Sequence, residues 1–177
     1  VKIMKINREK VEQLVRTMKP LFTDSSRASQ IKTKGACDYV TQVDIQVQKL
    51  IKEGLYQMYP QVQFMGEEQD NTAIDRKGDF WILDPVDGTT NLIHDFRHST
   101  LSLAYAEAGT VELGIVYQPY TDEMFVAVKG KGAFLNGEPI HVSEAKTLSE
   151  SLVTIGTSPY YHELADWNFA VFKKVFL

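Results

Sequence analysis

Two pairs of acidic residues stand where short apolar runs end. Glu67 and Glu68 follow one run, and Asp84 and Asp87 follow the next. Two carboxylates about 4 Å apart repel each other by roughly 4 kcal/mol at an effective dielectric constant of ~20. Such a cluster is therefore partly protonated or filled by a cation, and oxygen ligands suit Mg²⁺ first, then Mn²⁺ or Ca²⁺. For Glu67 and Glu68 alone, an ordinary strand end that meets solvent explains the acids equally well.

The segment Asp-Pro-Val-Asp-Gly-Thr-Thr-Asn, which begins at Asp84, indicates a more specific site. Pro85 disfavours helix at the preceding residue, so we expect Asp84 to end its strand and a turn to bring Asp87 back toward it. Gly88 permits an unusual φ or a close backbone approach. A short helix that begins near Thr89 would direct its first N–H groups toward the carboxylates. Carboxylates beside an anion site predict a metal that bridges to a phosphate.

The elements that must position these residues are two helices and a set of strands. Apolar residues spaced three and four apart predict one helix over residues 11–22, with Asn7 as its N-cap, and another over residues 43–58, which Pro60 ends. The polar stretch 23–36 between them predicts a loop. We expect strands at 62–65, 80–83, 101–105, 111–117, 124–128, 133–135 and 151–155, and a last helix over 162–177.

The close spacing of the strand candidates favours antiparallel pairing. The fold expected is α+β, a layered α/β sandwich with the N-terminal helix pair packed on an antiparallel sheet. The start of a second α/β half follows. The corresponding domains are an N-terminal metal- and phosphate-binding domain over residues 1–146 and the beginning of an incomplete C-terminal α/β domain over residues 147–177.

Composition excludes several classes of protein. The chain has 177 residues, 44% of them hydrophobic and 24% charged, with a net charge of −4. This argues against a disordered chain and against a general attraction to nucleic acid. It has no apolar stretch of about 18 residues, so no membrane partner is expected. A single cysteine, Cys37, and the lack of an apolar leader predict a cytoplasmic protein.

The acidic segments resemble those of a known family. Gly66-Glu67-Glu68 followed by Asp84 to Asn91 is similar to the inositol monophosphatase family of metal-dependent phosphatases. Further matching pieces, in the same order, are Asp38-Tyr39-Val40-Thr41 with Asp44, Gly114-Ile115-Val116-Tyr117, and Lys129 to Phe134 with Asn136-Gly137. The resemblance runs from about residue 7 to residue 155.

The resemblance implies a metal site. It assigns the carboxylates of Glu67, Asp84 and Asp87 and the carbonyl of Val86 to the metal, as two or three Mg²⁺ ions, with Mn²⁺ possible. Glu67 would also bind the ion that carries the attacking water.

The resemblance also implies catalytic and phosphate-binding roles. Thr89, paired with Asp44, would position that water and help to deprotonate it. Asp87 and the backbone N–H groups of Gly88 and Thr89 would hold the phosphate. Glu68 would contact the metal ligands without binding the metal itself.

Three expected site residues have alternative interpretations. Thr41-x-x-Asp44 also fits a helix capping box, and the two roles coexist if Asp44 faces the site. Lys34 and Asp38 lie in the loop expected before the second helix. That loop could close over the metals, and a plain surface loop explains it equally well.

The function expected is Mg²⁺-dependent hydrolysis of a small polyol or sugar phosphate such as inositol 1-phosphate. The partner is then a small phosphate ester, and family members are commonly homodimers. The same chemistry on fructose 1,6-bisphosphate, 3′-phosphoadenosine nucleotides or NADP is an alternative. A non-catalytic metal-binding or interaction module is an alternative of another class.

The family has a further metal-binding aspartate in a Trp-Asp-x-Ala-Ala-Gly motif, which this sequence lacks, and Asp166-Trp167 has the reverse order. We therefore expect the chain to match the first two-thirds of a family member.

Overall fold

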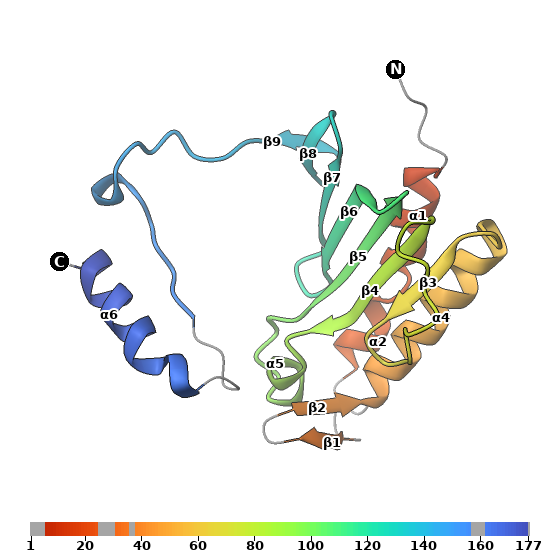
Figure 1. Cartoon of the computed structure of the whole chain (residues 1–177), viewed down its shortest axis with the longest axis horizontal. Coiled ribbons are helices and arrows are strands. Elements are labelled where there is room, and N and C mark those ends of the chain that lie inside the picture. Colours follow the sequence, from red (N-terminus) through yellow and green to blue (C-terminus); the bar gives the residue numbers. More distant parts are fainter. Residues whose placement is uncertain (1–5, 25–30, 36–37, 157–161, 177) are drawn as a thin grey trace. The chain divides into compact units, whose positions relative to one another are not determined.

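The computed structural model describes residues 6–24, 31–35, 38–156 and 162–176 (Figure 1). Its helices are α1 (Arg8–Arg16), α2 (Lys19–Thr23), α4 (Gln42–Met58), α5 (Thr89–Ile93) and α6 (Ala165–Phe176), with 3₁₀ turns at Leu148–Glu150 and His162–Leu164. Its strands are β1 (Ile31–Gly35), β2 (Asp38–Thr41), β3 (Gln63–Gly66), β4 (Phe80–Asp87), β5 (Thr100–Glu107), β6 (Thr110–Gln118), β7 (Glu123–Val128), β8 (Gly132–Leu135) and β9 (Glu138–Ile140).

The chain forms two compact units. One comprises Val1–Lys32 and Tyr39–Ile140, and the other comprises Thr33–Asp38 and His141–Leu177. The first unit contains the seven-stranded sheet, in the order β3-β4-β5-β6-β7-β8-β9. It also contains every expected site residue except Lys34 and Asp38.

The strands from β4 to β9 pair antiparallel, as predicted for those from β4 to β8. The prediction is wrong for β3, which runs parallel to β4. Residues 67–79 connect the two strands, and a connection of about a dozen residues is long enough for a parallel crossover. The carboxyl ends of β3 and β4 therefore lie at the same end of the sheet, where Glu67 directly follows β3 and Asp87 ends β4.

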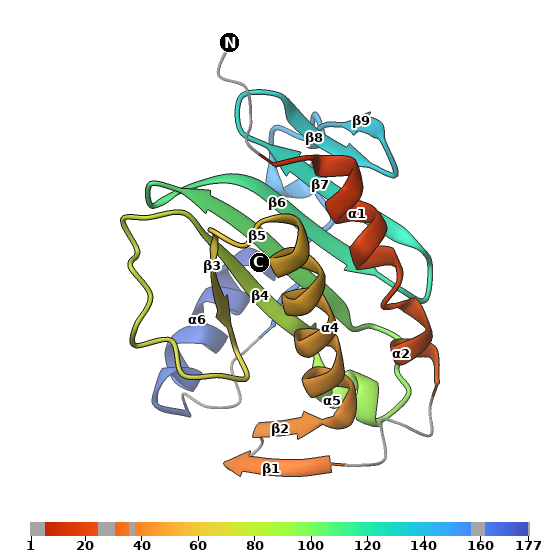
Figure 2. The same ribbon diagram turned by 90° about the vertical axis from the view of Figure 1, so that its right-hand side faces the viewer.

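The α1 and α4 helices pack on one face of this sheet (Figure 2). Asn7 caps α1 as expected, and its side chain accepts a hydrogen bond from the Lys10 N–H at 3.1 Å. Apolar residues of both helices and alternate residues of the strands form one core. Fully buried members include Val15, Val47, Ile51, Leu55, Trp81, Tyr105 and Ile115. The α+β architecture, with a helix pair layered on a largely antiparallel sheet, is confirmed.

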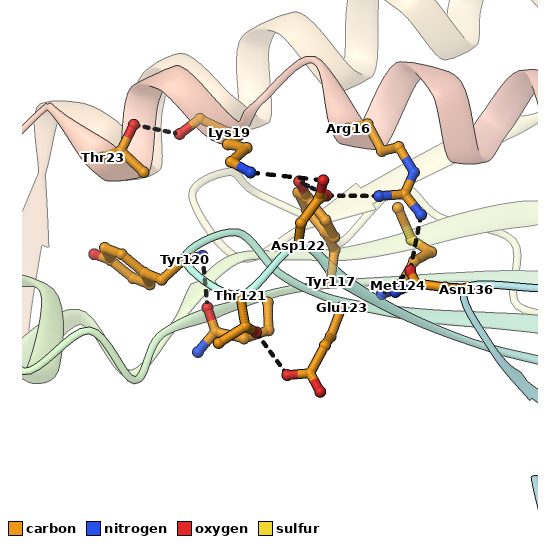
Figure 3. Close-up of polar contacts among 11 residues, drawn as sticks. Arg16, Lys19, Thr23, Tyr117, Tyr120, Thr121, Asp122, Glu123, Met124 and Asn136 are labelled. Atoms are coloured by element: carbon orange, nitrogen blue, oxygen red, sulfur yellow. Dashed lines mark hydrogen bonds and ion pairs between the residues drawn. The ribbon is translucent and has the colours of Figure 1, made fainter.

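A cluster of polar contacts fixes α1 to two sheet turns (Figure 3). The Arg16 guanidinium donates to the Asp122 carboxylate at 2.6 Å and to the Asn136 side-chain oxygen at 2.9 Å. Asp122 also accepts from the Tyr117 hydroxyl at 2.7 Å and lies 3.6 Å from the Lys19 ammonium. We call these five residues the Arg16 cluster.

Several predicted boundaries are wrong. The helix expected over 11–22 is two helices, because the chain turns at Thr17 and Met18 and restarts with Pro20 in the first turn of α2. The loop expected over 23–36 contains β1, and β1 pairs with β2. Residues 151–155 form no strand, and β9 was not anticipated.

The second unit contains the predicted last helix, which begins as the turn His162–Leu164 and continues as α6. Phe169 and Phe172 of α6 contact each other with ring centroids 5.8 Å apart. Among the described residues of the whole chain, no helix is both long and apolar enough to span a bilayer.

Candidate metal and phosphate site

The parallel pairing of β3 and β4 brings the two acidic segments together. The Glu67 N–H donates to the Leu83 carbonyl at 3.1 Å, so the residue after β3 is joined to β4. The side chains of Glu67 and Asp84 are close enough to share a hydrogen bond. Asp84 lies on the sheet face opposite to the Leu83 side chain, and with Ser102 it lines a cavity of about 390 Å³ on that face.

Asp84 is in an unfavourable environment for a carboxylate. Burial, the neighbouring charge of Glu67, the hydrogen bond with Glu67 and the charge of Asp87 raise the pKa of Asp84 to about 7. A hydrogen bond from the Val86 N–H, at 3.1 Å, acts in the opposite direction. Both neighbouring groups that raise the pKa are acids, which is the electrostatic signature of a site that favours a cation.

The structure corrects the expected end of the strand at Asp84. The β4 strand continues through Pro85 to Asp87, and its register against β5 shifts between Asp84 and Asp87. Such an irregularity changes the direction of side chains without ending the pairing of the two strands. Asp84 is partly buried and Asp87 is exposed, so the two carboxylates leave the strand in different environments.

The turn expected between Asp84 and Asp87 lies instead at Gly88, and the short helix α5 begins at Thr89 as predicted. Gly88 has φ +90°, and a Cβ there would lie 3.0 Å from the His98 carbonyl oxygen and 3.1 Å from the Asn91 side-chain nitrogen. Only glycine both adopts this positive φ without strain and fits the space left by these two atoms. The buried Ser99 hydroxyl donates to the Gly88 carbonyl at 2.8 Å and fixes the turn from the other side.

Asp44 serves α4 and the site through different oxygens. Its Oδ2 accepts from the Thr41 N–H at 2.8 Å and from the Thr41 hydroxyl at 2.5 Å, which completes the capping box. Its Oδ1 lies 3.2 Å from the Thr89 hydroxyl oxygen. Asp44 is 2% exposed, so this contact is shielded from water. The two interpretations of Asp44 are therefore compatible.

The Thr89 hydroxyl has two acceptors and one hydrogen. It lies 3.1 Å from the Val86 carbonyl oxygen and 3.2 Å from Asp44 Oδ1. The side chain of Thr89 thus bridges the α4 N-terminus and the strand end that carries the acidic residues. A carbonyl oxygen has two lone pairs, so the contact with Thr89 leaves Val86 able to accept a second partner.

The oxygen-rich donor set fits a hard cation in its chemistry. In the described part of the chain, however, no three His, Cys, Asp or Glu side chains are grouped closely enough to hold a metal ion by themselves. The structure brings Glu67 and Asp84 into contact, while Asp87 acts on Asp84 through its charge.

The remaining expected site residues are Glu68, Lys34 and Asp38. The Glu68 N–H donates to the Gln48 side-chain oxygen at 2.9 Å, which places Glu68 in the turn that carries Glu67. Lys34 lies in β1 and Asp38 in β2, so the expectation of a loop at these positions is wrong. Their side chains lie outside the described part of the structure.

Three residues that support the site were not anticipated from the sequence. Ser99 holds the Gly88 turn, and Gln48 and Asn71 hold the Glu67–Glu68 turn. Gln48 lies four residues after Asp44 on α4, so helical spacing could have suggested that both face the site. Asn71 and Ser99 lie outside helices and have no comparable signal.

Comparisons with known proteins agree with the sequence motifs. The model of the inositol monophosphatase family matches residues 2–175. An inositol monophosphatase of Dictyostelium discoideum is 41% identical over 132 residues, which are 73% of this chain and 48% of that protein. A fructose-1,6-bisphosphatase/inositol-1-monophosphatase of Thermotoga maritima is 41% identical over 127 residues, 71% of this chain and 48% of that protein. The chain thus spans about half the length of these relatives.

Solved structures share the fold. The extragenic suppressor protein suhB of Bartonella henselae superposes with a TM-score of 0.74 at 31% identity, over 79% of this chain and 55% of that one. An IMPase/NADP phosphatase in complex with Mg²⁺ and phosphate superposes with a TM-score of 0.64 at 31% identity, over 74% of this chain and 49% of that one. On the family match and these identities, the chain belongs to the inositol monophosphatase family.

Proposed function

We propose that this protein is a Mg²⁺-dependent phosphatase that hydrolyses a small phosphate monoester. The observation that supports it most is the Thr89–Asp44 contact of 3.2 Å beside the contacting carboxyls of Glu67 and Asp84. A hydroxyl–carboxylate pair that can accept a proton lies next to oxygen ligands for a cation. Membership of the family supports the same reaction class.

Glu67, Asp84, Asp87 and the Val86 carbonyl would hold the metal. When bound, Mg²⁺ would neutralise phosphate charge and make water more acidic. Asp44 orients the Thr89 hydroxyl, since its other oxygen is fixed by Thr41. Thr89 would accept a hydrogen bond from the attacking water and, on taking that proton, would give its own hydroxyl proton to Asp44. In this assignment Asp87 and the N–H groups of Gly88 and Thr89 face the phosphate.

The substrate we propose is a small polyol or sugar phosphate such as inositol 1-phosphate. Relatives named inositol monophosphatase support this choice. The Thermotoga maritima relative also has fructose-1,6-bisphosphatase in its name, and the Mg²⁺ and phosphate complex is of an IMPase/NADP phosphatase. These support fructose 1,6-bisphosphate and NADP as the second candidates, with 3′-phosphoadenosine nucleotides after them.

Further properties belong to this proposal. We propose two or three Mg²⁺ ions, replaceable by Mn²⁺, a homodimer, and a cytoplasmic location. We also propose residues 1–146 as the metal- and phosphate-binding domain and residues 147–177 as the beginning of the next domain. Lys34 and Asp38, like Glu68, are proposed to contact the metal ligands without binding the metal themselves.

The test is phosphate release from inositol 1-phosphate by the full-length protein during a Mg²⁺ titration. Metal-dependent release supports the proposal, and Asp87→Asn should abolish it without unfolding the protein, because Asp87 is exposed. Full activity of Asp87→Asn contradicts the role of Asp87. Metal uptake by calorimetry with no phosphate released from any of the named esters would favour the non-catalytic binding module instead.

A further inference from the structure

The Glu67–Glu68 turn follows an edge strand. The β3 strand is the first in the sheet order, so β4 covers only one of its sides. Gln63 and Glu67 donate their N–H groups to Asp79 and Leu83, at 3.1 Å each, toward β4. Because alternate residues of a strand turn their backbone groups in opposite directions, Phe64 and Gly66 direct theirs to the open edge.

Side-chain amides occupy that edge in place of a neighbouring strand. The Gly66 N–H donates to Asn71 Oδ1 at 3.2 Å, and Asn71 Nδ2 donates to the Gly66 carbonyl at 2.7 Å. Gln69 Nε2 donates to the Phe64 carbonyl at 2.8 Å and to Asn71 Oδ1 at 3.1 Å. We call Gln69 and Asn71 the edge cap. The paired bonds of Asn71 fix both backbone groups of the residue directly before Glu67.

The other end of the turn is fixed from α4. Gln48 Oε1 accepts from the Glu68 N–H at 2.9 Å, and Gln48 is 8% exposed. A Cβ on Gly66 would lie 2.4 Å from this same Oε1 atom, so Gly66 is what lets Gln48 reach the turn. Lys52, one turn further along α4, donates to Gln69 at 2.7 Å and joins the edge cap to the same helix.

Glu67 therefore lies between two fixed neighbours. Asn71 holds Gly66 on one side, Gln48 holds Glu68 on the other, and the Glu67 N–H is bound to Leu83. Gln48 belongs to the helix whose N-terminus carries Asp44, so one helix positions both the Asp44 and the Glu67 arms of the site. Glu67 is exposed, and whether its carboxyl reaches Asp84 depends on this backbone.

We infer that Asn71 and Gln48 are positioning residues for metal binding, which set the direction of the Glu67 carboxylate by fixing the backbone on both sides of it. This inference rests on the proposed function and adds the residues on which metal affinity depends. Groups that orient metal ligands typically change metal affinity by about 10–100-fold when they are removed.

The experiment measures Mg²⁺ binding by calorimetry and the Mg²⁺ dependence of phosphate release from inositol 1-phosphate, in the full-length protein. Asn71→Ala and Gln48→Met should each weaken Mg²⁺ binding by about 10-fold or more. At saturating Mg²⁺, kcat should return close to the wild-type value and KM for inositol 1-phosphate should change little. Gln48→Glu keeps an acceptor for the Glu68 N–H and should restore most of the affinity that Gln48→Met loses.

Thr72→Ala is the matched control, because Thr72 follows Asn71 in the same loop and its N–H bonds to Asp70. This variant should bind Mg²⁺ like the wild type. Folding of each variant is checked by thermal unfolding, and Gln48→Met tests the inference from α4 if Asn71→Ala fails to fold.

Wild-type Mg²⁺ affinity in both Asn71→Ala and Gln48→Met would overturn the inference while leaving the proposed function intact. A lowered kcat with unchanged Mg²⁺ affinity would also overturn it. If the wild-type protein releases phosphate from none of the esters, the proposed function fails, and calorimetry of the same variants still tests the positioning of Glu67.

Discussion

Asp84 and Asp122 are aspartates at opposite extremes of electrostatic environment in one sheet. Burial and two neighbouring acids, Glu67 and Asp87, raise the pKa of Asp84 to about 7. A hydrogen bond from the Tyr117 hydroxyl and then the charges of Arg16 and Lys19 hold the pKa of Asp122 below its usual range. Asp122 is stabilised by this protein's own side chains, whereas the Asp84 carboxylate accepts a hydrogen bond from the Val86 N–H but lies beside two acids, so an added cation would stabilise it.

The comparison separates stability from function. In the Arg16 cluster each charged group has a partner of opposite sign or a hydrogen-bond donor, which stabilises the attachment of α1 to the sheet (Figure 3). At the acidic site the fold holds Glu67 and Asp87 near Asp84, so the negative charges repel one another. Polar groups whose placement lowers the stability of a folded protein typically belong to functional sites.

The largest effect expected is on catalysis. Asp84→Asn removes a proposed metal ligand and should lower phosphate release at moderate Mg²⁺ by about 100-fold or more. Asp122→Asn, the matched change in the Arg16 cluster, should leave release close to the wild-type value. Steady-state assays of both variants with inositol 1-phosphate make the comparison. Equal losses in the two variants would show that Asp84 acts through folding rather than through the metal.

The next effect is a pH dependence of the metal-free protein. The pKa of Asp84 is higher in the folded protein than the ordinary value near 3.9, so the folded state binds the proton more tightly. The stabilisation is complete below about pH 4 and is lost as the pH rises toward 7. We expect the free energy of unfolding with chelator present to fall by about 1–3 kcal/mol from pH 5 to pH 7.5.

Urea unfolding at several pH values measures this slope. Asp84→Asn should flatten it and should make the metal-free protein more stable than the wild type at pH 7.5. Asp122 does not interfere, because its lowered pKa confines its own contribution to more acidic conditions. If the stability of Asp84→Asn depends on pH as that of the wild type does, a group other than Asp84 causes the dependence.

A smaller, purely structural loss is expected in the Arg16 cluster. Asp122→Ala removes the acceptor of the buried Tyr117 hydroxyl and the partner of Arg16, at a cost of about 1–2 kcal/mol in the free energy of unfolding. Partial exposure of the ion pair keeps the cost modest. Urea unfolding gives the value, and the Mg²⁺ dependence of phosphate release should not change. An unchanged midpoint would mean that solvent replaces these contacts.

The smallest effect expected is the loss of stability when the Tyr117 hydroxyl alone is removed. Tyr117→Phe keeps the buried ring, over which the Arg16 guanidinium lies at 5.7 Å, and removes only the hydrogen bond to Asp122. We expect a loss of about 0.5–1.5 kcal/mol in the free energy of unfolding. A double-mutant cycle with Asp122→Ala should show strong coupling. Strict additivity of the two changes would contradict a direct hydrogen bond between them.

Local sequence determined much of this protein. Helical spacing, the Asn7 cap and the Thr41–Asp44 box predicted α1 and α4, because caps and periodicity act within a few residues. The antiparallel order of β5 to β8 followed from short connections. The acidic residues of the site could be named for the same reason, since each lies in or beside a short, distinctive motif.

Only the tertiary structure decided how those motifs meet. The parallel pairing of β3 with β4 puts Glu67 against Asp84, and no local pattern distinguishes that pairing from an antiparallel one. The contact of Asp44 with Thr89 joins residues 45 positions apart. Asn71 meets its partners at the uncovered edge of β3, and Gln48 meets the Glu68 N–H where α4 passes the turn after β3. An amide side chain has no assigned partner until a backbone is brought to it. Sequence thus specified the chemical groups, and long-range pairing specified their geometry.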